Sequence, residues 1–189
     1  MVLFAYLIGS IPFGFLVAKA RGVNIKQVGS GNIGATNVAR NLGWKIGALV
    51  GVLDFLKGYL PVLLAREVFT QNWQILLISL IPVIGHIFPV WLQFKGGKAV
   101  ATIFGILAGY FGIAYFLIFL LLWILAVWQV KLMSLVNLVV ALLIPIVFWL
   151  KFNDLIFILF GLILCIIIWW RHSENIKRLL AGKENPISL

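Results

Sequence analysis

Acidic side chains are scarce in this sequence. Only five of its 189 residues are aspartate or glutamate, and two are histidine. No Ser-His-Asp order, pair of close carboxylates or metal-ligand cluster can be picked out, so an enzyme of this sequence would have few nucleophiles. The single cysteine, Cys165, lies within an apolar run, which predicts neither a disulfide nor a thiolate metal site.

Charged residues of either sign are also few. They make up 11% of the chain, hydrophobic residues make up 63%, and the mean hydropathy is +1.15. Because a soluble domain carries about 25% charged residues, this composition predicts an integral membrane protein. The net charge of +10 does not indicate nucleic-acid binding here, since Lys and Arg gather on the cytoplasmic loops of membrane proteins and set their orientation.

The N-terminal apolar run predicts a retained membrane span. Residues 2–17 are apolar, and the first cations, Lys19, Arg21 and Lys26, come after this run. A secretory signal would place positive charge before its apolar stretch. We therefore expect a first span with its N-terminus outside.

Long apolar segments predict an all-α bundle of about seven transmembrane helices, forming one domain over residues 1–189. The segments are about 1–19, 44–66, 73–92, 98–109, 111–129, 132–150 and 154–170. The fourth is short and contains Gly105 and Gly109, with Gly112 just after it, so five or six spans is the alternative.

The distribution of cations supports an outside N-terminus and a cytoplasmic C-terminus. In this topology the outer segments hold two cations, Arg66 and Lys151, and the inner segments hold twelve. The inner cations are Lys19, Arg21, Lys26, Arg40, Lys45, Lys95, Lys98, Lys131, Arg171, Lys177, Arg178 and Lys183. The polar stretches 21–43, 93–98 and 171–189 would then share the cytoplasmic face.

The first polar stretch is GSGNIGATNVAR, residues 29–40. It matches G-x-G-x-x-G, but no strand precedes it, and Asp54, at the ribose-binding spacing, lies in an apolar span. Glycines still allow a close backbone approach, and successive N–H groups can bind an anion. The expected phosphate-binding residues are Ser30, Asn32, Thr36, Asn37 and Arg40. The alternative is an ordinary glycine-rich loop that ends in a helix cap.

The second polar stretch is GHIFPVWLQFKGGKAVAT, residues 85–102. Leu92 stands where a Walker loop requires its first glycine, which excludes that motif. Two glycines flanked by lysines at the start of a helix nevertheless favour a phosphate seat. The expected substrate-binding residues are His86, Lys95, Gly96, Gly97 and Lys98. The alternative is a tight turn that carries positive-inside charge.

The third polar stretch is RHSENIKRLLAGKE, residues 171–184. It predicts an amphipathic helix whose apolar face lies on the membrane, with Lys177 and Arg178 toward phosphates of lipid or substrate. His172 and Asn175 are three residues apart on one face and could line a site, His172 as a base. The alternative for His172 is a hydrogen-bonding anchor at the membrane boundary.

Four further polar residues fall within predicted spans. Asp54 and Lys57 are three apart in the second span. Because charges at this depth are costly unless paired, a structural ion pair is favoured over catalysis. Ser134 and Asn137, near the inner end of the sixth span, either pack helices together or form the floor of the site.

Together, the three polar stretches resemble the three motifs of the bacterial acyl-phosphate-dependent glycerol-3-phosphate acyltransferases. The segments DFLKG at 54–58 and IGSIPFGFLVAK at 8–19 also resemble this family, and the likeness covers essentially the whole chain. Three positions differ. Gln93 and Ala99 stand where the family motif has glycine, and Trp91 stands where it has phenylalanine.

The resemblance implies transfer of an acyl group from acyl phosphate to the 1-hydroxyl of sn-glycerol 3-phosphate. The products would be 1-acylglycerol 3-phosphate (lysophosphatidic acid) and phosphate, in the first acylation of phospholipid synthesis. It implies no use of acyl-CoA and no metal or organic cofactor; we expect a monomer or weak oligomer. The alternative, a small membrane transporter of an organic phosphate or another anion, should show polar residues at the midplane of several spans.

The expected division of roles follows from two phosphates that repel one another. Cations beside glycine turns would hold both phosphates, with Ser134, Lys177 and Arg178 also in substrate binding. Lys98, His172 and Asn175 form the expected catalytic set, the last two orienting glycerol phosphate and its hydroxyl. The proton would pass to His172 or to a substrate phosphate oxygen. The phosphate is favoured because no carboxylate obviously orients His172.

Overall fold

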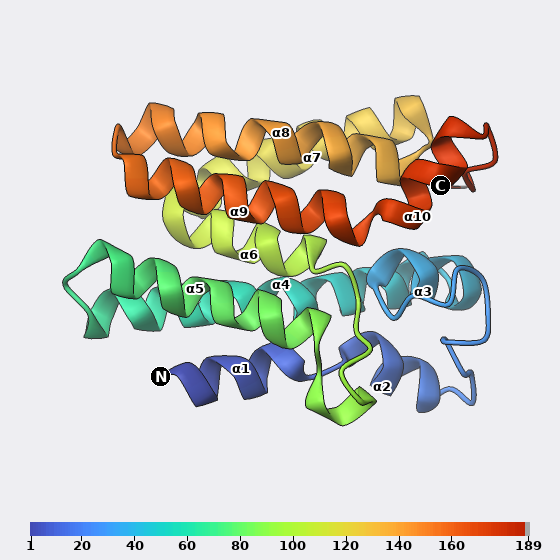
Figure 1. Cartoon of the computed structure of the whole chain (residues 1–189). Helices are drawn as coiled ribbons and strands as arrows, with labels where there is room; N and C mark the ends of the chain where they lie inside the picture. The colour runs from blue at the N-terminus through green and yellow to red at the C-terminus, as the bar shows by residue number, and fades with distance from the viewer. Residues whose placement is uncertain (188–189) are drawn as a thin grey trace. The chain divides into compact units, whose positions relative to one another are not determined.

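The computed structural model describes residues 1–187, and the regular secondary structure within this range is helical, with no strand (Figure 1). In chain order the helices are α1 (Val2–Ser10), α2 (Phe13–Lys19), α3 (Ala35–Leu42), α4 (Trp44–Val68), α5 (Asn72–Ile87), the 3-10 turn η1 (Val90–Leu92), α6 (Val100–Phe111), α7 (Ile113–Val130), α8 (Met133–Phe152), α9 (Leu155–Arg171) and α10 (Ser173–Leu180).

Each of the seven predicted apolar segments is helical. Within residues 1–187, five segments are long and apolar enough to cross a membrane, and a sixth is obtained if α9 and α10, bent by 61°, count as one span. Helix α6 has 12 residues, or about 18 Å, against a hydrocarbon core of about 30 Å. The all-helical membrane class is confirmed, while the count of seven and the orientation of the termini stay predictions.

The first apolar segment is broken between α1 and α2 by Pro12. A residue that precedes proline is pushed out of the helical region, and Ile11 accordingly has φ −61° and ψ 116°. Pro12 also has no N–H with which to continue the helical ladder. The break leaves the carbonyl of Ile11 to other donors, and Lys57 Nζ donates to it at 3.0 Å.

Packing divides the chain into two compact units, Met1–Phe116 and Leu117–Leu189, which are described separately below as the first and second units. The prediction of a single acyltransferase domain stays a prediction.

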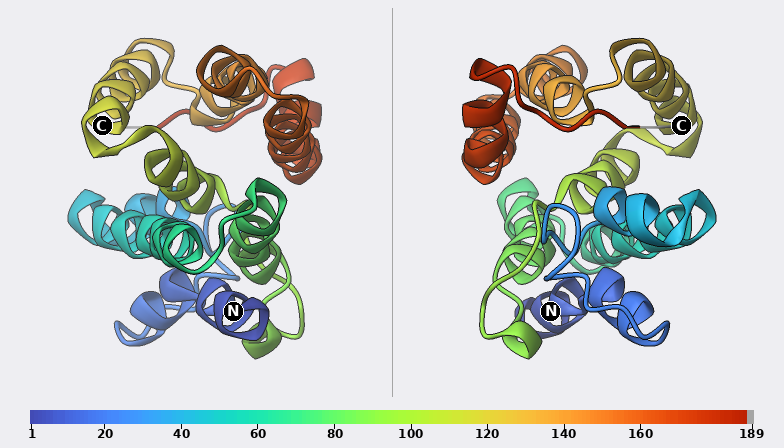
Figure 2. Two further views of the ribbon diagram at one scale, coloured as in Figure 1. Left: turned by 90° about the vertical axis from the view of Figure 1, so that its left-hand side faces the viewer. Right: turned by 90° about the vertical axis from the view of Figure 1, so that its right-hand side faces the viewer.

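In the first unit, α4 packs against α6, α5 packs against α1, and α3 lies along the start of α4. Both end-on views in Figure 2 show α4 and α5 side by side, with α1 and α6 on opposite sides of them. Glycine makes the α4–α6 contact possible, since a methyl group at Gly58 would overlap the carbonyl of Thr102. Small residues at such crossings let membrane helices approach closely.

In the second unit, α8 and α9 form a packed pair, and the chain turns at His172 into α10. The C-terminal segment then crosses back, and the backbone N–H of Ile187 donates to the carbonyl of Lys131 at 2.8 Å. Ile187 is buried with Val127 and Val136. The tail thus joins the end of α10 to the turn between α7 and α8.

Candidate active site

Asn37, on the first turn of α3, holds the glycine-rich loop in shape. Its side chain is 2% exposed, and its Nδ2 donates to the carbonyls of Ile25, Val28 and Asn32 at 3.2, 3.0 and 2.9 Å. Its Oδ1 accepts the backbone N–H of Ser30 at 2.9 Å. The sequence predicts that Asn37 binds substrate. The structure shows its amide fixing the loop backbone, so Asn37 acts on the loop's shape.

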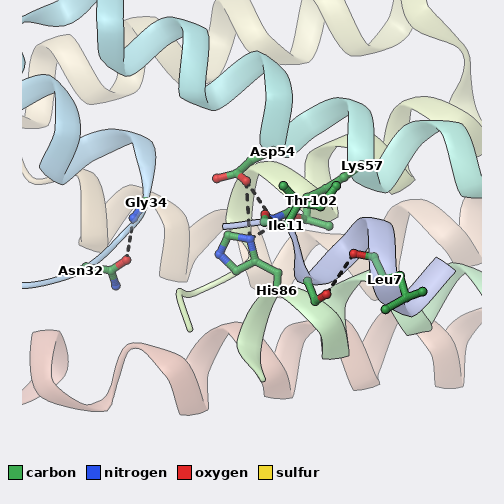
Figure 3. Close-up of polar contacts among 9 residues, drawn as sticks. Leu7, Ile11, Asn32, Gly34, Asp54, Lys57, His86 and Thr102 are labelled. Atoms are coloured by element: carbon green, nitrogen blue, oxygen red, sulfur yellow. Dashed lines mark hydrogen bonds and ion pairs between the residues drawn. The ribbon is translucent and has the colours of Figure 1, made fainter. Parts of the chain in front are cut away.

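The rest of this loop presents polar groups outward. Gly29 and Gly31 have φ of 59° and 69°, a left-handed conformation that glycine adopts without strain. The N–H of Gly34, which caps α3, donates to Asn32 Oδ1 at 2.9 Å (Figure 3). Ser30 and Arg40 are exposed, whereas Asn32 and Thr36 are half-buried. These four side chains lie on or next to the turn at Gly29 and Gly31, and they are exposed enough to bind an anion from solution.

The Lys95–Lys98 loop begins and ends in strained backbone. Gln93 has φ 54°, Phe94 has φ 61° and Ala99 has φ 61°. A side chain in this left-handed region costs roughly 1–2 kcal/mol. Gln93 and Ala99 are the two positions at which the resemblance leads us to expect glycine, and glycine adopts this left-handed conformation without strain.

The N–H groups of the glycine pair are used within the protein. Gly96 N–H donates to the carbonyl of Ile87 at 3.0 Å, and Gly97 N–H donates to that of His86 at 3.1 Å. The predicted seat, in which these two N–H groups would face a phosphate, is therefore not supported. The loop still carries two cations, since Lys95 is exposed and Lys98 is half-buried.

A buried polar cluster lies beneath this loop and consists of Asp54 and Lys57 on α4, His86 on α5 and Thr102 on α6. The predicted ion pair is present, with Lys57 Nζ 2.8 Å from Asp54 Oδ1. His86 Nδ1 lies 3.7 Å from the same carboxylate oxygen and 3.4 Å from Thr102 Oγ1 (Figure 3). None of the four residues is more than 5% exposed. His86 thus lies beneath the loop rather than on its surface.

In the second unit, His172 sits at the joint between α9 and α10 and is 2% exposed. Its Nδ1 lies 2.7 Å from the carbonyl of Ile168. Because a carbonyl only accepts, Nδ1 carries a hydrogen, and in the neutral form of the ring Nε2 is then an acceptor. The sequence shows no obvious carboxylate that could orient this ring. In the structure, the backbone carbonyl of Ile168 orients it instead.

Glu184 gathers three of the predicted residues of the second unit. It accepts from Ser134 Oγ at 2.9 Å, from Asn175 Nδ2 at 2.6 Å and from Arg178 Nε at 2.7 Å. Burial alone would raise the pKa of Glu184, but these hydrogen bonds and the charge of Arg178 hold its pKa below the usual value. Sequence reasoning missed Glu184, although an isolated acid after a glycine turn in a cationic segment was a usable signal.

Two other polar residues of the second unit lie apart from the Glu184 contacts. Lys177 pairs with Glu174 at 3.0 Å, and the two side chains are 74% and 71% exposed. Asn137 Oδ1 accepts the indole N–H of Trp123 at 2.9 Å, which joins α7 to α8. The helix-packing alternative is thus favoured for Asn137.

Three comparisons with known proteins identify the family to which this chain is similar. The sequence model of a family described as glycerol-3-phosphate acyltransferase matches residues 1–182. The glycerol-3-phosphate acyltransferase of Aquifex aeolicus is 42% identical over 188 residues, which cover 98% of this chain and 96% of the relative. That of Rhodopseudomonas palustris (strain HaA2) is 42% identical over 187 residues, which cover 98% and 93%.

Solved structures of PlsY (YgiH), described as an integral membrane glycerol 3-phosphate acyltransferase, are also similar. The glycerol 3-phosphate form has a TM-score of 0.92 and 39% identity, and the match covers 99% of this chain and 94% of that one. The lysophosphatidic acid form has a TM-score of 0.89 and 38% identity, with 99% and 93% covered.

Proposed function

Because this chain belongs to the glycerol-3-phosphate acyltransferase family, we propose that it transfers an acyl group from acyl phosphate to the 1-hydroxyl of sn-glycerol 3-phosphate. The enzyme acts in phospholipid synthesis, and its products are 1-acylglycerol 3-phosphate and phosphate. The match of the family to nearly the whole chain carries this proposal. The choice of acyl phosphate as donor is supported by the three polar motifs and by the scarcity of nucleophiles.

The chemistry needs no covalent bond to the enzyme. The 1-hydroxyl oxygen attacks the carbonyl carbon of the acyl phosphate, an ester C–O bond forms, and the C–O bond to the phosphate breaks. The hydroxyl proton passes to an oxygen of the substrate phosphate, which gains negative charge as the bond breaks. Since acyl phosphate is already activated, the enzyme contributes positioning and stabilisation of charge.

In the first unit, the exposed side of the glycine-rich loop and the Lys95–Lys98 loop bind the substrate phosphates. Arg40 offers a bidentate fork and Lys98 a point charge, while Ser30 and Thr36 add neutral hydrogen bonds. Asn37 keeps the first loop in the shape that these contacts need. Charge, exposure and loop geometry support these roles.

In the second unit, His172 and Asn175 orient glycerol 3-phosphate. His172 contacts glycerol 3-phosphate through Nε2 and so orients its 1-hydroxyl, because Nδ1 is committed to Ile168. Asn175 and Arg178 contact the polar end of the same substrate, and Glu184 holds both side chains in place. Ser134 supports Glu184 from α8.

The proposed setting is the inner (plasma) membrane, with seven spans, the N-terminus outside and the active face cytoplasmic. Short α6 is the fourth span in this arrangement, and it packs against the longer α4. The excess of inner over outer cations in the sequence supports the orientation. A monomer or weak oligomer is sufficient for the reaction.

The test uses purified protein in detergent or lipid with palmitoyl phosphate and glycerol 3-phosphate, and it follows phosphate release. Palmitoyl-CoA serves as the parallel donor. The proposal predicts release that requires glycerol 3-phosphate and occurs with palmitoyl phosphate alone. Transfer from palmitoyl-CoA at the same rate as from palmitoyl phosphate would contradict the assignment of acyl phosphate as the donor. If a folded preparation transferred acyl groups from neither donor but moved glycerol 3-phosphate into proteoliposomes, the result would contradict the proposed acyltransferase activity and favour the transporter.

A further inference from the structure

The polar cluster of Asp54, Lys57, His86 and Thr102 is costly for a helix bundle in a membrane. Ionised side chains at this depth lose their hydration even when they are paired, and an apolar pair of similar volume packs as well or better. Stability alone therefore does not account for the cluster. Its contacts show which parts of the chain it joins.

The ring of His86 is the side of the cluster that meets the Lys95–Lys98 loop. A methyl group placed on Gly97 would overlap His86 Nε2, so the ring lies directly on the Gly97 backbone. The carbonyl of His86 accepts the N–H of Gly97 at 3.1 Å, and that of the next residue, Ile87, accepts the N–H of Gly96 at 3.0 Å. Ring and loop are thus in contact through both side chain and backbone, and a rotated ring would displace Gly97.

The other members of the cluster fix that ring. Asp54 Oδ1 at 3.7 Å and Thr102 Oγ1 at 3.4 Å both face His86 Nδ1, from α4 and from the first turn of α6 (Figure 3). Lys57 neutralises Asp54 and also donates to the carbonyl of Ile11 at the break between α1 and α2. The same carboxylate oxygen, Asp54 Oδ1, therefore faces both Lys57 Nζ and His86 Nδ1.

We propose that Asp54, Lys57 and Thr102 are positioning residues for acyl transfer. They fix His86 against Gly97, and His86 in turn holds the loop so that Lys98 meets a substrate phosphate. This inference rests on the proposed function, because it assigns the phosphate contact to Lys98. Asp54 and Lys57 act through His86 and do not touch the substrate.

A merely structural cluster predicts a different kinetic result. If the cluster only stabilised the helices, its loss would lower Tm and the yield of folded enzyme, and it would leave the KM of the surviving enzyme unchanged. Positioning instead predicts a higher KM for a phosphate-bearing substrate in enzyme that is fully folded. The split between Tm and KM therefore separates the two.

The test compares Thr102→Val and the double variant Asp54→Asn/Lys57→Met with a matched control, Tyr110→Phe. Thr102→Val removes one contact to His86 at nearly constant volume, and the double variant removes both charges together. Tyr110 OH lies 3.0 Å from Ser79 Oγ and joins the same two helices, α5 and α6, away from the loop. Its loss should lower Tm and leave both KM values unchanged.

We expect Thr102→Val and the double variant to raise the KM for glycerol 3-phosphate or palmitoyl phosphate by about fivefold or more, a change equivalent to roughly 1 kcal/mol. Unchanged KM values in folded Thr102→Val would overturn the inference, whether or not the double variant folds. An equal rise in Tyr110→Phe would overturn it as well.

A binding measurement separates this inference from the proposed function. Glycerol 3-phosphate and inorganic phosphate are added separately to the wild-type protein and to Thr102→Val, and the ligand-induced rise in Tm is recorded. If the wild-type protein showed no turnover in the phosphate-release assay, the proposed function would be wrong, but the binding measurement could still be made. A smaller rise in Tm for Thr102→Val would still support the positioning of the phosphate-binding loop, and an equal rise would contradict it.

Discussion

Replacing Asn37 with alanine removes the side chain on which the shape of the glycine-rich loop depends. Five hydrogen-bond contacts are lost. Nδ2 donates to the carbonyls of Ile25, Val28 and Asn32, and Oδ1 accepts from the N–H of Ser30 and from Nδ2 of Asn41. Helix α3 itself keeps its backbone ladder. The damage is therefore confined to the loop, which opens more readily while the rest of the unit stays folded.

The magnitude follows from the number and the exposure of these bonds. Nδ2 has two hydrogens, so its three contacts count as two bonds, and Oδ1 accepts two more. At a net value of about 0.5–1.5 kcal/mol each, these four bonds are worth about 2–6 kcal/mol. All but the bond to Ile25 are only part-buried, so water satisfies some of the freed groups, and we expect the lower half of that range. A loss of about 2–4 kcal/mol in the ordered loop corresponds to a fall in kcat/KM of about 30- to 700-fold.

The assay is kcat/KM for glycerol 3-phosphate, with Tm measured on the same preparations. Asn37→Asp keeps the shape of the side chain but turns an oxygen toward three carbonyls, so its kcat/KM should fall at least as far. Asn24→Ala is the matched control, because Asn24 is an exposed residue of the same loop with one longer contact, at 3.3 Å to the N–H of Lys26. Asn37→Ala with kcat/KM within about twofold of the wild type would refute the reasoning.

Gln93→Gly should raise the free energy of unfolding by about 0.5–1 kcal/mol, because it relieves a left-handed side chain at an exposed position. Ala99→Gly should leave it nearly unchanged, since the same relief is offset by the loss of a buried methyl group, and a larger gain than for Gln93→Gly would contradict this. Burial opposes ionisation of Glu184, but its hydrogen bonds leave a pKa below the usual 4.5. The carboxylate therefore stabilises the fold above pH 4.5 and loses this effect as pH falls through its lower folded pKa, so Glu184→Gln should flatten the decline of Tm below pH 4.5. His172→Ala should lower kcat by about 100-fold or more in folded enzyme, and near-wild-type turnover would exclude an essential role.

The sequence was sufficient for the membrane class and for the positions of the helices, because long apolar runs separated by polar stretches leave few alternatives. It also located the polar loops and the Asp54–Lys57 ion pair, since a three-residue spacing places two charges on one helix face. The break at Ile11 was not predicted. Pro12 was a usable signal for it, as proline cannot continue a helix.

The partners of individual polar groups were out of reach, because they depend on contacts between residues distant in the sequence. Glu184 meets Ser134 across fifty positions, and the Gly96 N–H turns back to Ile87 instead of facing outward. Asn37 is a similar case, since one amide can bind a ligand or bind the backbone around it. A composition pattern does not distinguish these uses, whereas the hydrogen-bond geometry does.

Direct transfer of the acyl group, without an acyl-enzyme, is the central claim of this account. The measurement is a rapid-quench experiment in which enzyme and palmitoyl phosphate are mixed at equal concentrations, with and without glycerol 3-phosphate, and the intact protein and the products are weighed by mass spectrometry. We predict that phosphate and 1-palmitoylglycerol 3-phosphate appear together, only when glycerol 3-phosphate is present, while the protein mass stays constant. A burst of phosphate without glycerol 3-phosphate, accompanied by a palmitoylated protein, would contradict the account.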